Sequence, residues 1–129
     1  MQAPLVLAAS LLAILGGCSD GCANDVVSRA TSPDGKVSAV IFERNCGATT
    51  GYSTQISLIG PDKEPSGPGN LFRADTGHGA ARSGAWGGPW AELRWLSPNH
   101  LLVRYATGAR IFEQSARVGG VDVTYEAAP

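Results

Sequence analysis

TSPDGKVSAVIFE, at residues 31–43, predicts a β-hairpin near the start of the folded chain. Its first half favours a tight turn, because Pro33 presets φ, Asp34 can bond back to the backbone and Gly35 accepts a positive φ. Its second half predicts a strand over residues 37–44 with apolar side chains on both faces. One face carries Val37, Ala39 and Ile41, and the other carries Val40 and Phe42. We therefore expect this strand to lie in the middle of a sheet.

Period-two alternation and turn residues predict further strands on both sides of this hairpin. They cover residues 26–32, 53–59, 91–96, 101–106 and 121–126. Residues 71–74 can form one short strand, and residues 110–118 fit either a strand or a short helix. Gly119-Gly120 supports a hairpin into residues 121–126, where Val121, Val123 and Tyr125 alternate with polar residues.

The fold class that follows is a small, single-domain, all-β protein, built as an antiparallel sheet or sandwich. The turns at residues 32–36 and 97–100 give two similar strand–turn–strand units, which look like outer hairpins of β-propeller blades. Two units cannot close a propeller, so we expect a pair of sheets instead. The stretch from Gly60 to Trp90 is rich in Gly and Pro, and we expect it to form a long surface loop rather than a domain boundary.

The first seventeen residues have the pattern of a signal peptide. The apolar run at residues 5–15 is too short to cross a bilayer as a helix, and no Lys or Arg precedes it. Leu15-Gly16-Gly17-Cys18 resembles the lipobox of bacterial lipoproteins. The resemblance implies that residues 1–17 are removed, that Cys18 carries a diacylglyceryl group, and that residues 18–24 form a tether to a domain at residues 25–129. The alternative is an ordinary secretory leader, with Cys18 left free or in a disulfide.

The chain has three cysteines, an odd number. If Cys18 carries lipid, Cys22 and Cys46 remain as a pair in an oxidising compartment, where a disulfide is the usual state. Free thiols and pairing between two chains are the alternatives.

Two strings carry a second resemblance: SPDGK at residues 32–36 and CGATTGYSTQIS at residues 46–57. They are similar to those of a family of small uncharacterised bacterial proteins, which often continue with a Trp-containing strand and a final V-x-V-x-Y. The resemblance covers most of the chain after Cys18. It implies one fold unit and an exported protein, and it brings no catalytic residues with it.

Charge and motifs exclude several classes of function. Ten basic and eleven acidic residues are interspersed, with a net charge of −1, so there is no footprint for nucleic acid and no polybasic membrane patch. No P-loop, dinucleotide-binding or nucleophile-elbow motif occurs, and Asp75 and Glu92 do not form a recognisable catalytic pair. His78 and His100 are isolated, so we expect no metal and no cofactor.

Three candidate sites remain. Cys46 could act as a nucleophile with either histidine as its base, but a disulfide competes with that role. A hydroxyl- and amide-rich patch could bind a sugar or a peptide, although its residues also suit an ordinary strand; it comprises Thr49, Thr50, Tyr52, Ser53, Thr54 and Gln55. Trp86 and Trp90 could line a binding lip or pack back onto the sheet, whereas Trp95 belongs to the core.

From these observations we expect a non-enzymatic binding protein of the bacterial cell envelope. A lipid on Cys18 would hold it to a membrane, facing the periplasm or the exterior, and its partner would be an envelope protein or glycan. One alternative is an inhibitor of an envelope-directed hydrolase, which would insert the Gly60–Trp90 loop into an enzyme cleft. A further alternative is a small thiol or hydrolase enzyme.

Overall fold

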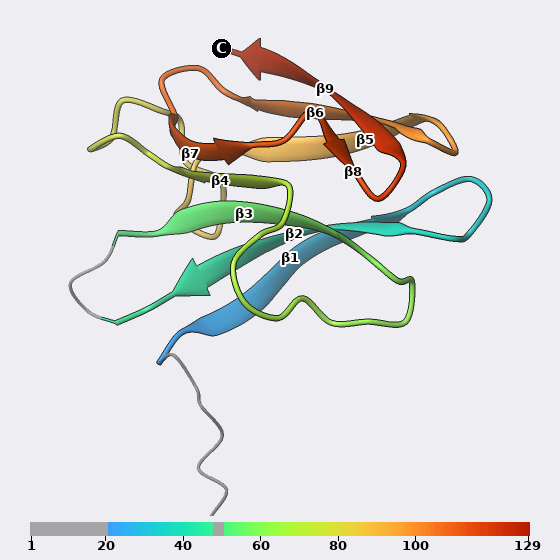
Figure 1. Ribbon diagram of the computed structural model, residues 1–129. Coiled ribbons are helices and arrows are strands. Elements are labelled where there is room, and N and C mark those ends of the chain that lie inside the picture. The colour runs from blue at the N-terminus through green and yellow to red at the C-terminus, as the bar shows by residue number, and fades with distance from the viewer. Residues whose placement is uncertain (1–20, 48–50) are drawn as a thin grey trace, which may run out of the picture.

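The computed structural model describes residues 21–47 and 51–129. It shows a small all-β domain with two sheets stacked on one another, which confirms the predicted fold class (Figure 1). The predicted leader, Cys18, Thr49 and Thr50 lie outside the described residues. In the part that is described, no helix has the length and apolarity needed to cross a membrane.

The larger sheet has five strands in the order β1-β2-β3-β4-β7. They are β1 (Ala23–Thr31), β2 (Ser38–Asn45), β3 (Ser53–Ile59), β4 (Phe72–Asp75) and β7 (Arg110–Gln114). The smaller sheet has the order β5-β6-β9-β8. Its strands are β5 (Ala91–Ser97), β6 (His100–Ala106), β8 (Arg117–Val118) and β9 (Val121–Ala128). Because β1 begins at Ala23, two residues of the predicted tether belong to the fold.

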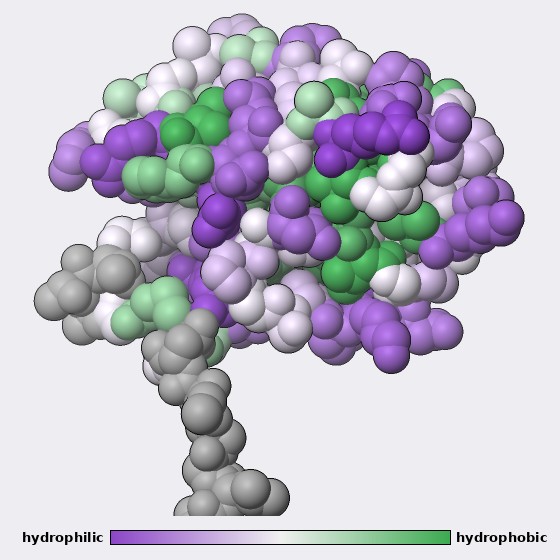
Figure 2. Space-filling model, in the orientation of Figure 1, coloured by the Kyte–Doolittle hydropathy of each residue, from purple (hydrophilic) through white to green (hydrophobic). Residues whose placement is uncertain are grey.

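The core lies between the two sheets and uses the faces that the alternation predicted. The larger sheet contributes Ala39, Ile41, Ile56, Leu58, Phe72 and Ala74, and the smaller one Ala91, Leu101, Val103, Val121 and Val123. Leu93, Trp95, Tyr105 and Tyr125 pack against this cluster. The Trp95 indole N–H donates to the Ala30 carbonyl at 2.9 Å, which ties β5 to β1. Figure 2 shows apolar residues gathered in the middle of one face, with polar residues around them.

Two of the predicted turns show how their residues determine the backbone. In the β1–β2 hairpin the Gly35 N–H donates to the Ser32 carbonyl at 2.8 Å, and the Asp34 carboxylate accepts from the Ser32 hydroxyl at 2.7 Å. Gly119 and Gly120 both have a positive φ, 54° and 81°, between the paired residues Val118 and Val121. A two-residue turn of this kind needs a positive φ at both positions, which explains the Gly-Gly sequence.

Two features differ from the expectation of an antiparallel fold. Strands β6 and β9 pair in parallel, with His100 opposite Asp122 and Ala106 opposite Ala128. The ambiguous residues 110–118 form neither one strand nor a helix, since β7 joins the larger sheet and β8 the smaller one. The chain therefore crosses between the layers before β9 returns beside β6, and this crossover is what allows a parallel pair.

Residues 60–90 form a long Gly/Pro-rich loop that is interrupted by one short strand, as the sequence predicted. β4 forms as an inner strand of the larger sheet, paired with β3 and β7. Leu71, Ala81 and Pro89 are buried as well. Polar side chains, rather than an apolar pattern, hold the residues just before β4 in place.

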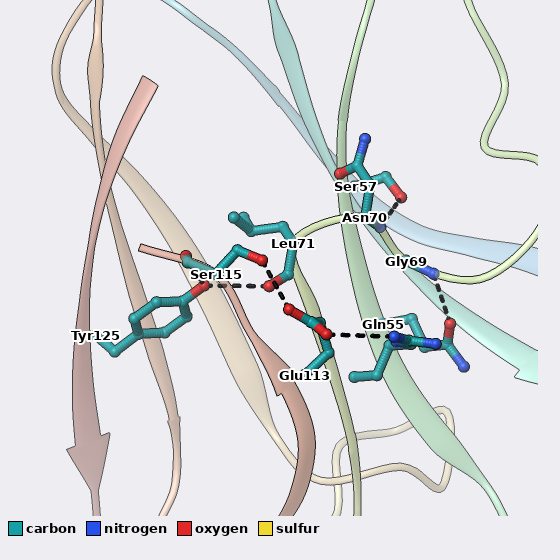
Figure 3. Close-up of polar contacts among 9 residues, drawn as sticks. Gln55, Ser57, Gly69, Asn70, Leu71, Glu113, Ser115 and Tyr125 are labelled. Carbon is teal, nitrogen blue, oxygen red and sulfur yellow. Dashed lines mark hydrogen bonds and ion pairs between the residues drawn. The ribbon is translucent and has the colours of Figure 1, made fainter. Parts of the chain in front are cut away.

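Asn70 is the clearest case of such a side chain. Its Oδ1 accepts from the Leu58 N–H at 2.8 Å and its Nδ2 donates to the Leu58 carbonyl at 2.9 Å, as a neighbouring strand would. Beside it, the Gly69 N–H donates to Gln55 Oε1 at 2.7 Å and the Asn70 N–H to Ser57 Oγ at 3.1 Å (Figure 3). These hydrogen bonds fix Gly69 and Asn70 to β3.

The Tyr125 hydroxyl joins this segment to the other sheet. It donates to the Ser115 carbonyl at 2.7 Å, and the Leu71 carbonyl lies 3.3 Å away (Figure 3). Burial raises the pKa of Tyr125, so the hydroxyl keeps its proton and remains a donor.

Cys22 and Cys46 form a disulfide, as predicted. Ala23 and Asn45 are the pair at the open end of the β1–β2 ladder, away from the turn. The bridge therefore lies directly beyond that end. The β1–β2 hairpin is thus closed by a turn at one end and by a covalent bond at the other.

We expect the Cys22→Ser/Cys46→Ser variant to lose roughly 3–3.5 kcal/mol of unfolding free energy, the loop-closure value for a bridge of this span. Urea denaturation of the variant and of the wild type, with and without reductant, measures the difference. The reduced wild type should match the variant, and equal midpoints for the oxidised wild type and the variant would contradict a stabilising bridge.

Candidate functional site

The alternation of β2 changes from apolar to charged at its C-terminal end. Ala39 and Ile41 point into the sandwich, so Glu43 takes the next inward position and Arg44 points to the opposite face. Glu43 is only 6% exposed. A carboxyl group therefore occupies a core-facing position of the central strand.

The turn at residues 83–89 covers this end of the sandwich. Ser83 and Pro89 form a bridge, and the Gly84 N–H donates to the Gly88 carbonyl at 2.8 Å. A Cβ at Gly84 would lie 2.3 Å from the Trp86 ring, so only glycine lets the indole fold over the turn. A Cβ at Gly87 would lie 2.8 Å from the Tyr52 ring. The glycines of this stretch thus bring two aromatic rings close to the backbone.

A buried hydrogen-bond chain fixes the indole of Trp86. Its Nε1–H donates to Thr54 Oγ1 at 2.8 Å, and the Thr54 hydroxyl donates to the Pro89 carbonyl at 2.6 Å. Thr54 is completely buried. Trp86 therefore packs onto the sheet, and part of its ring also lines a hollow beside the sheet.

Glu43, Trp86 and Tyr52 line one open hollow of about 440 Å³ at the mouth between the sheets. The rest of its lining comes from Asp25, Val26, Val27, Asn45 and Ala85. We call this hollow the Glu43 pocket. The described residues that line it include two carboxyl groups, two aromatic rings and no basic side chain.

The Glu43 carboxyl lacks a full set of hydrogen-bond donors. Among the described residues, Oε1 is buried without a partner. Burial raises the pKa of Glu43, the Ser53 N–H lowers it by donating to the carboxylate, and the charge of Asp25 raises it again. An orphaned buried oxygen is costly, so the Glu43 carboxyl is a group whose burial the described residues do not fully compensate.

Asp25 lies opposite Glu43 in the β1–β2 register. Side chains at directly opposed positions share a face of the sheet, and like charges there repel each other. In the described part of the chain, neither carboxylate takes part in an ion pair. Each ionised carboxylate consequently raises the affinity of the pocket for a cation.

The structure brings together some of the predicted site residues and separates others. Trp86 and Tyr52 meet in the Glu43 pocket, and Tyr52 is 58% exposed. Trp90 lies elsewhere, half-buried beneath the Arg82 guanidinium at 4.4 Å from its ring centre. Thr49 and Thr50 fall outside the described residues, so their predicted role stays a prediction.

Two of the four described residues of the hydroxyl- and amide-rich patch, Thr54 and Gln55, are buried. Thr54 holds Trp86, and Gln55, 9% exposed, holds Gly69. The side-chain polar groups of Thr54 and Gln55 thus hold the fold together. This agrees with the alternative that these are ordinary strand residues rather than ligand contacts. Tyr52 remains accessible.

The proposed nucleophile and bases do not assemble. Cys46 is bonded to Cys22 and has no thiol to ionise. His78 is an exposed turn residue with a φ of 59°. His100 lies on the smaller sheet, where its Nε2 contacts Thr124 Oγ1 at 2.7 Å. Within residues 21–47 and 51–129, no group of three metal-binding side chains comes together.

Sequence reasoning missed Glu43 and Asp25. The signal for Glu43 was present, because it continues the inward positions of Ala39 and Ile41 with a charged residue. Asp25 could not be placed opposite it without the β1–β2 register.

No family model, curated protein or solved structure matches the chain. The chemistry of the pocket is what indicates its ligand. Carboxylates beside the faces of Trp and Tyr rings attract ammonium and guanidinium groups.

The Glu43→Gln variant should be more stable than the wild type by about 1 kcal/mol near pH 7, since it removes a buried charge. Because burial raises the pKa of Glu43, the wild type loses stability as the pH rises through that pKa, and the difference should shrink toward zero near about pH 4. Urea denaturation of both proteins at pH 7 and at about pH 4 measures this difference in unfolding free energy.

Asp62→Asn is the matched control, because Asp62 is exposed and lies outside the Glu43 pocket. It should change the unfolding free energy by less than about 0.5 kcal/mol at either pH. A Glu43→Gln variant less stable than the wild type at neutral pH would contradict the assignment of an uncompensated carboxylate.

Proposed function

We propose that this chain is a lipid-anchored protein of the bacterial cell envelope whose β domain binds a partner without catalysing a reaction. The lipobox resemblance of residues 15–18 supports the anchor, and the Cys22–Cys46 disulfide supports an oxidising compartment. The Glu43 pocket is the binding site in this proposal. Its ligand is a protonated amine or guanidinium on an envelope protein.

The single observation that carries the binding role is the unpartnered oxygen of Glu43. It sits in an otherwise packed interior, in a hollow walled by Trp86 and Tyr52. A cation entering there is attracted by the carboxylates of Glu43 and Asp25 and rests against two rings. A Lys or Arg side chain satisfies all these groups at once.

The two alternatives have less support. An inhibitor was expected to project the Gly60–Trp90 loop, whereas residues 72–75 of that stretch pair with β3 and β7, and Leu71, Ala81 and Pro89 are buried. A thiol enzyme would need Cys46 in its reduced form, and this residue forms the bridge to Cys22.

We expect Nα-acetyl-lysine amide to bind with a dissociation constant on the order of 1 mM, as for one small cationic group. Chemical-shift changes of the Trp86 indole N–H in ¹⁵N spectra measure the binding. Glu43→Gln should weaken it about tenfold, since a hydrogen bond to a charged group is worth about 1.5–3 kcal/mol. Affinity should fall as the pH drops through the raised pKa of Glu43, because the protonated carboxyl no longer attracts a cation.

Asp62→Asn serves as the matched control and should bind like the wild type. Nα-acetyl-norleucine amide, which has a similar stem and no charge, should not shift the Trp86 signal. Equal binding of both amides, or undiminished binding by Glu43→Gln, would overturn the assignment of a cation site.

The anchor is tested separately by mass spectrometry of the protein purified from bacterial membranes. We expect the mature chain to begin at Cys18 and to carry a diacylglyceryl group. Cys18→Ala should then leave the membrane fraction. Recovery of the chain with Met1 in place and an unmodified Cys18 would refute the anchor and leave the pocket experiment unaffected.

A further inference from the structure

A second charged hollow lies on the opposite face of the larger sheet. It has a volume of about 440 Å³, and its walls include Arg44, Arg73, Arg110, Ser53, Gln55 and Phe112. We call it the arginine groove. Its three guanidiniums come from β2, β4 and β7, and among the described residues Asp75 is the carboxyl group that lines it.

Among the described residues, the charge of Arg73 in the arginine groove is only partly compensated. Arg110 forms a close ion pair with Asp75, which lowers the pKa of that carboxyl. Arg73 has a long contact of 3.4 Å to Glu113, whose other oxygen accepts from the Ser115 hydroxyl at 2.8 Å (Figure 3). Arg73 Nε is buried without a partner among the described residues. Arg44 donates to Asn24 Oδ1 at 2.7 Å.

The arginine groove also lies next to the predicted anchor. Cys46 is part of its lining and is bonded to Cys22, which follows Cys18 by four residues. Four residues span at most roughly 14 Å when fully extended. A lipid on Cys18 would hold this end of the domain within that distance of the bilayer surface.

Phe112 gives the groove an apolar rim. It is 61% exposed, and the Arg110 guanidinium lies 5.1 Å from its ring centre. An aromatic ring beside arginines suits the membrane interface, where rings enter the headgroup layer and guanidiniums pair with phosphates.

We propose that the arginine groove binds the phosphate of an anionic phospholipid in the membrane that anchors Cys18. This inference rests on the proposed lipid anchor. Arg73, whose side chain is 37% exposed and has only a long contact to Glu113, supplies guanidinium N–H donors, and Phe112 enters the headgroup layer. The Arg44 and Arg110 guanidiniums line the same groove. The domain is thereby held in one orientation, with the Glu43 pocket on the face of the sheet turned away from the groove.

The test uses residues 18–129 with Cys18→Ser, which keeps every described residue and removes the acyl group. Co-sedimentation compares phosphatidylglycerol vesicles with phosphatidylcholine vesicles at low salt. We expect binding to the former only, with Arg73→Gln reducing the partition constant roughly fivefold, as for one basic residue at an anionic surface. Phe112→Ala should also reduce it.

Arg94→Gln is the control, because Arg94 is exposed on β5 in the other sheet and carries the same charge. It should leave the partition constant within about a factor of two, and thermal unfolding should show that all variants stay folded. Equal losses for Arg94→Gln and Arg73→Gln, or equal binding to both kinds of vesicle, would overturn the proposal.

A titration with glycerol phosphate separates the lipid from a soluble ligand. Weak or absent binding of the free phosphate, beside strong vesicle binding, supports the headgroup assignment. Tight binding of glycerol phosphate without vesicle binding would make the groove a soluble-phosphate site and would refute it. Neither result depends on whether Cys18 is acylated or on whether the Glu43 pocket takes a cation.

Discussion

Strand β2 is buried on both faces, and the rest of the domain is arranged to cover it. Ala39 and Ile41 face the second sheet, while Val40 and Phe42, also inaccessible to solvent, face the other way. The outer side is crossed by residues 60–70, which Asn24 and Arg29 hold through hydrogen bonds to the carbonyls of Pro65 and Lys63. A sheet with one solvated face would not need that segment; here it completes the domain.

The same strand explains why the two charged hollows occur together. Its apolar run ends at Phe42, and the next two residues, Glu43 and Arg44, point to opposite faces. Each face therefore ends in a hollow with a different predominant charge, acidic in the Glu43 pocket inside and basic in the arginine groove outside. One strand end thus sets the sign of both hollows, and their ligands are expected to differ in charge accordingly.

Period-two alternation predicted most strands and the inward faces of β5, β6 and β9, because side-chain burial alternates in any half-buried strand. It could not predict that β6 and β9 run in parallel, since the period is the same for both directions. Nor could it place residues 60–71, whose position depends on the Asn70 amide and the backbone of Leu58. Of the site, Trp86 and Tyr52 were foreseen, whereas the pairing of Glu43 with Asp25 depends on strand register.

The bridge beyond Ala23 and Asn45 has a mechanical consequence. Tension applied to the amino end of the chain reaches the fold at Cys22 and passes through sulfur directly into β2, the innermost of the first three strands. The hydrogen bonds of the β1–β2 ladder are bypassed, so they cannot be peeled apart one after another. Tension on the segment before Cys22 is therefore shared by the whole sheet, rather than acting on its outermost strand alone.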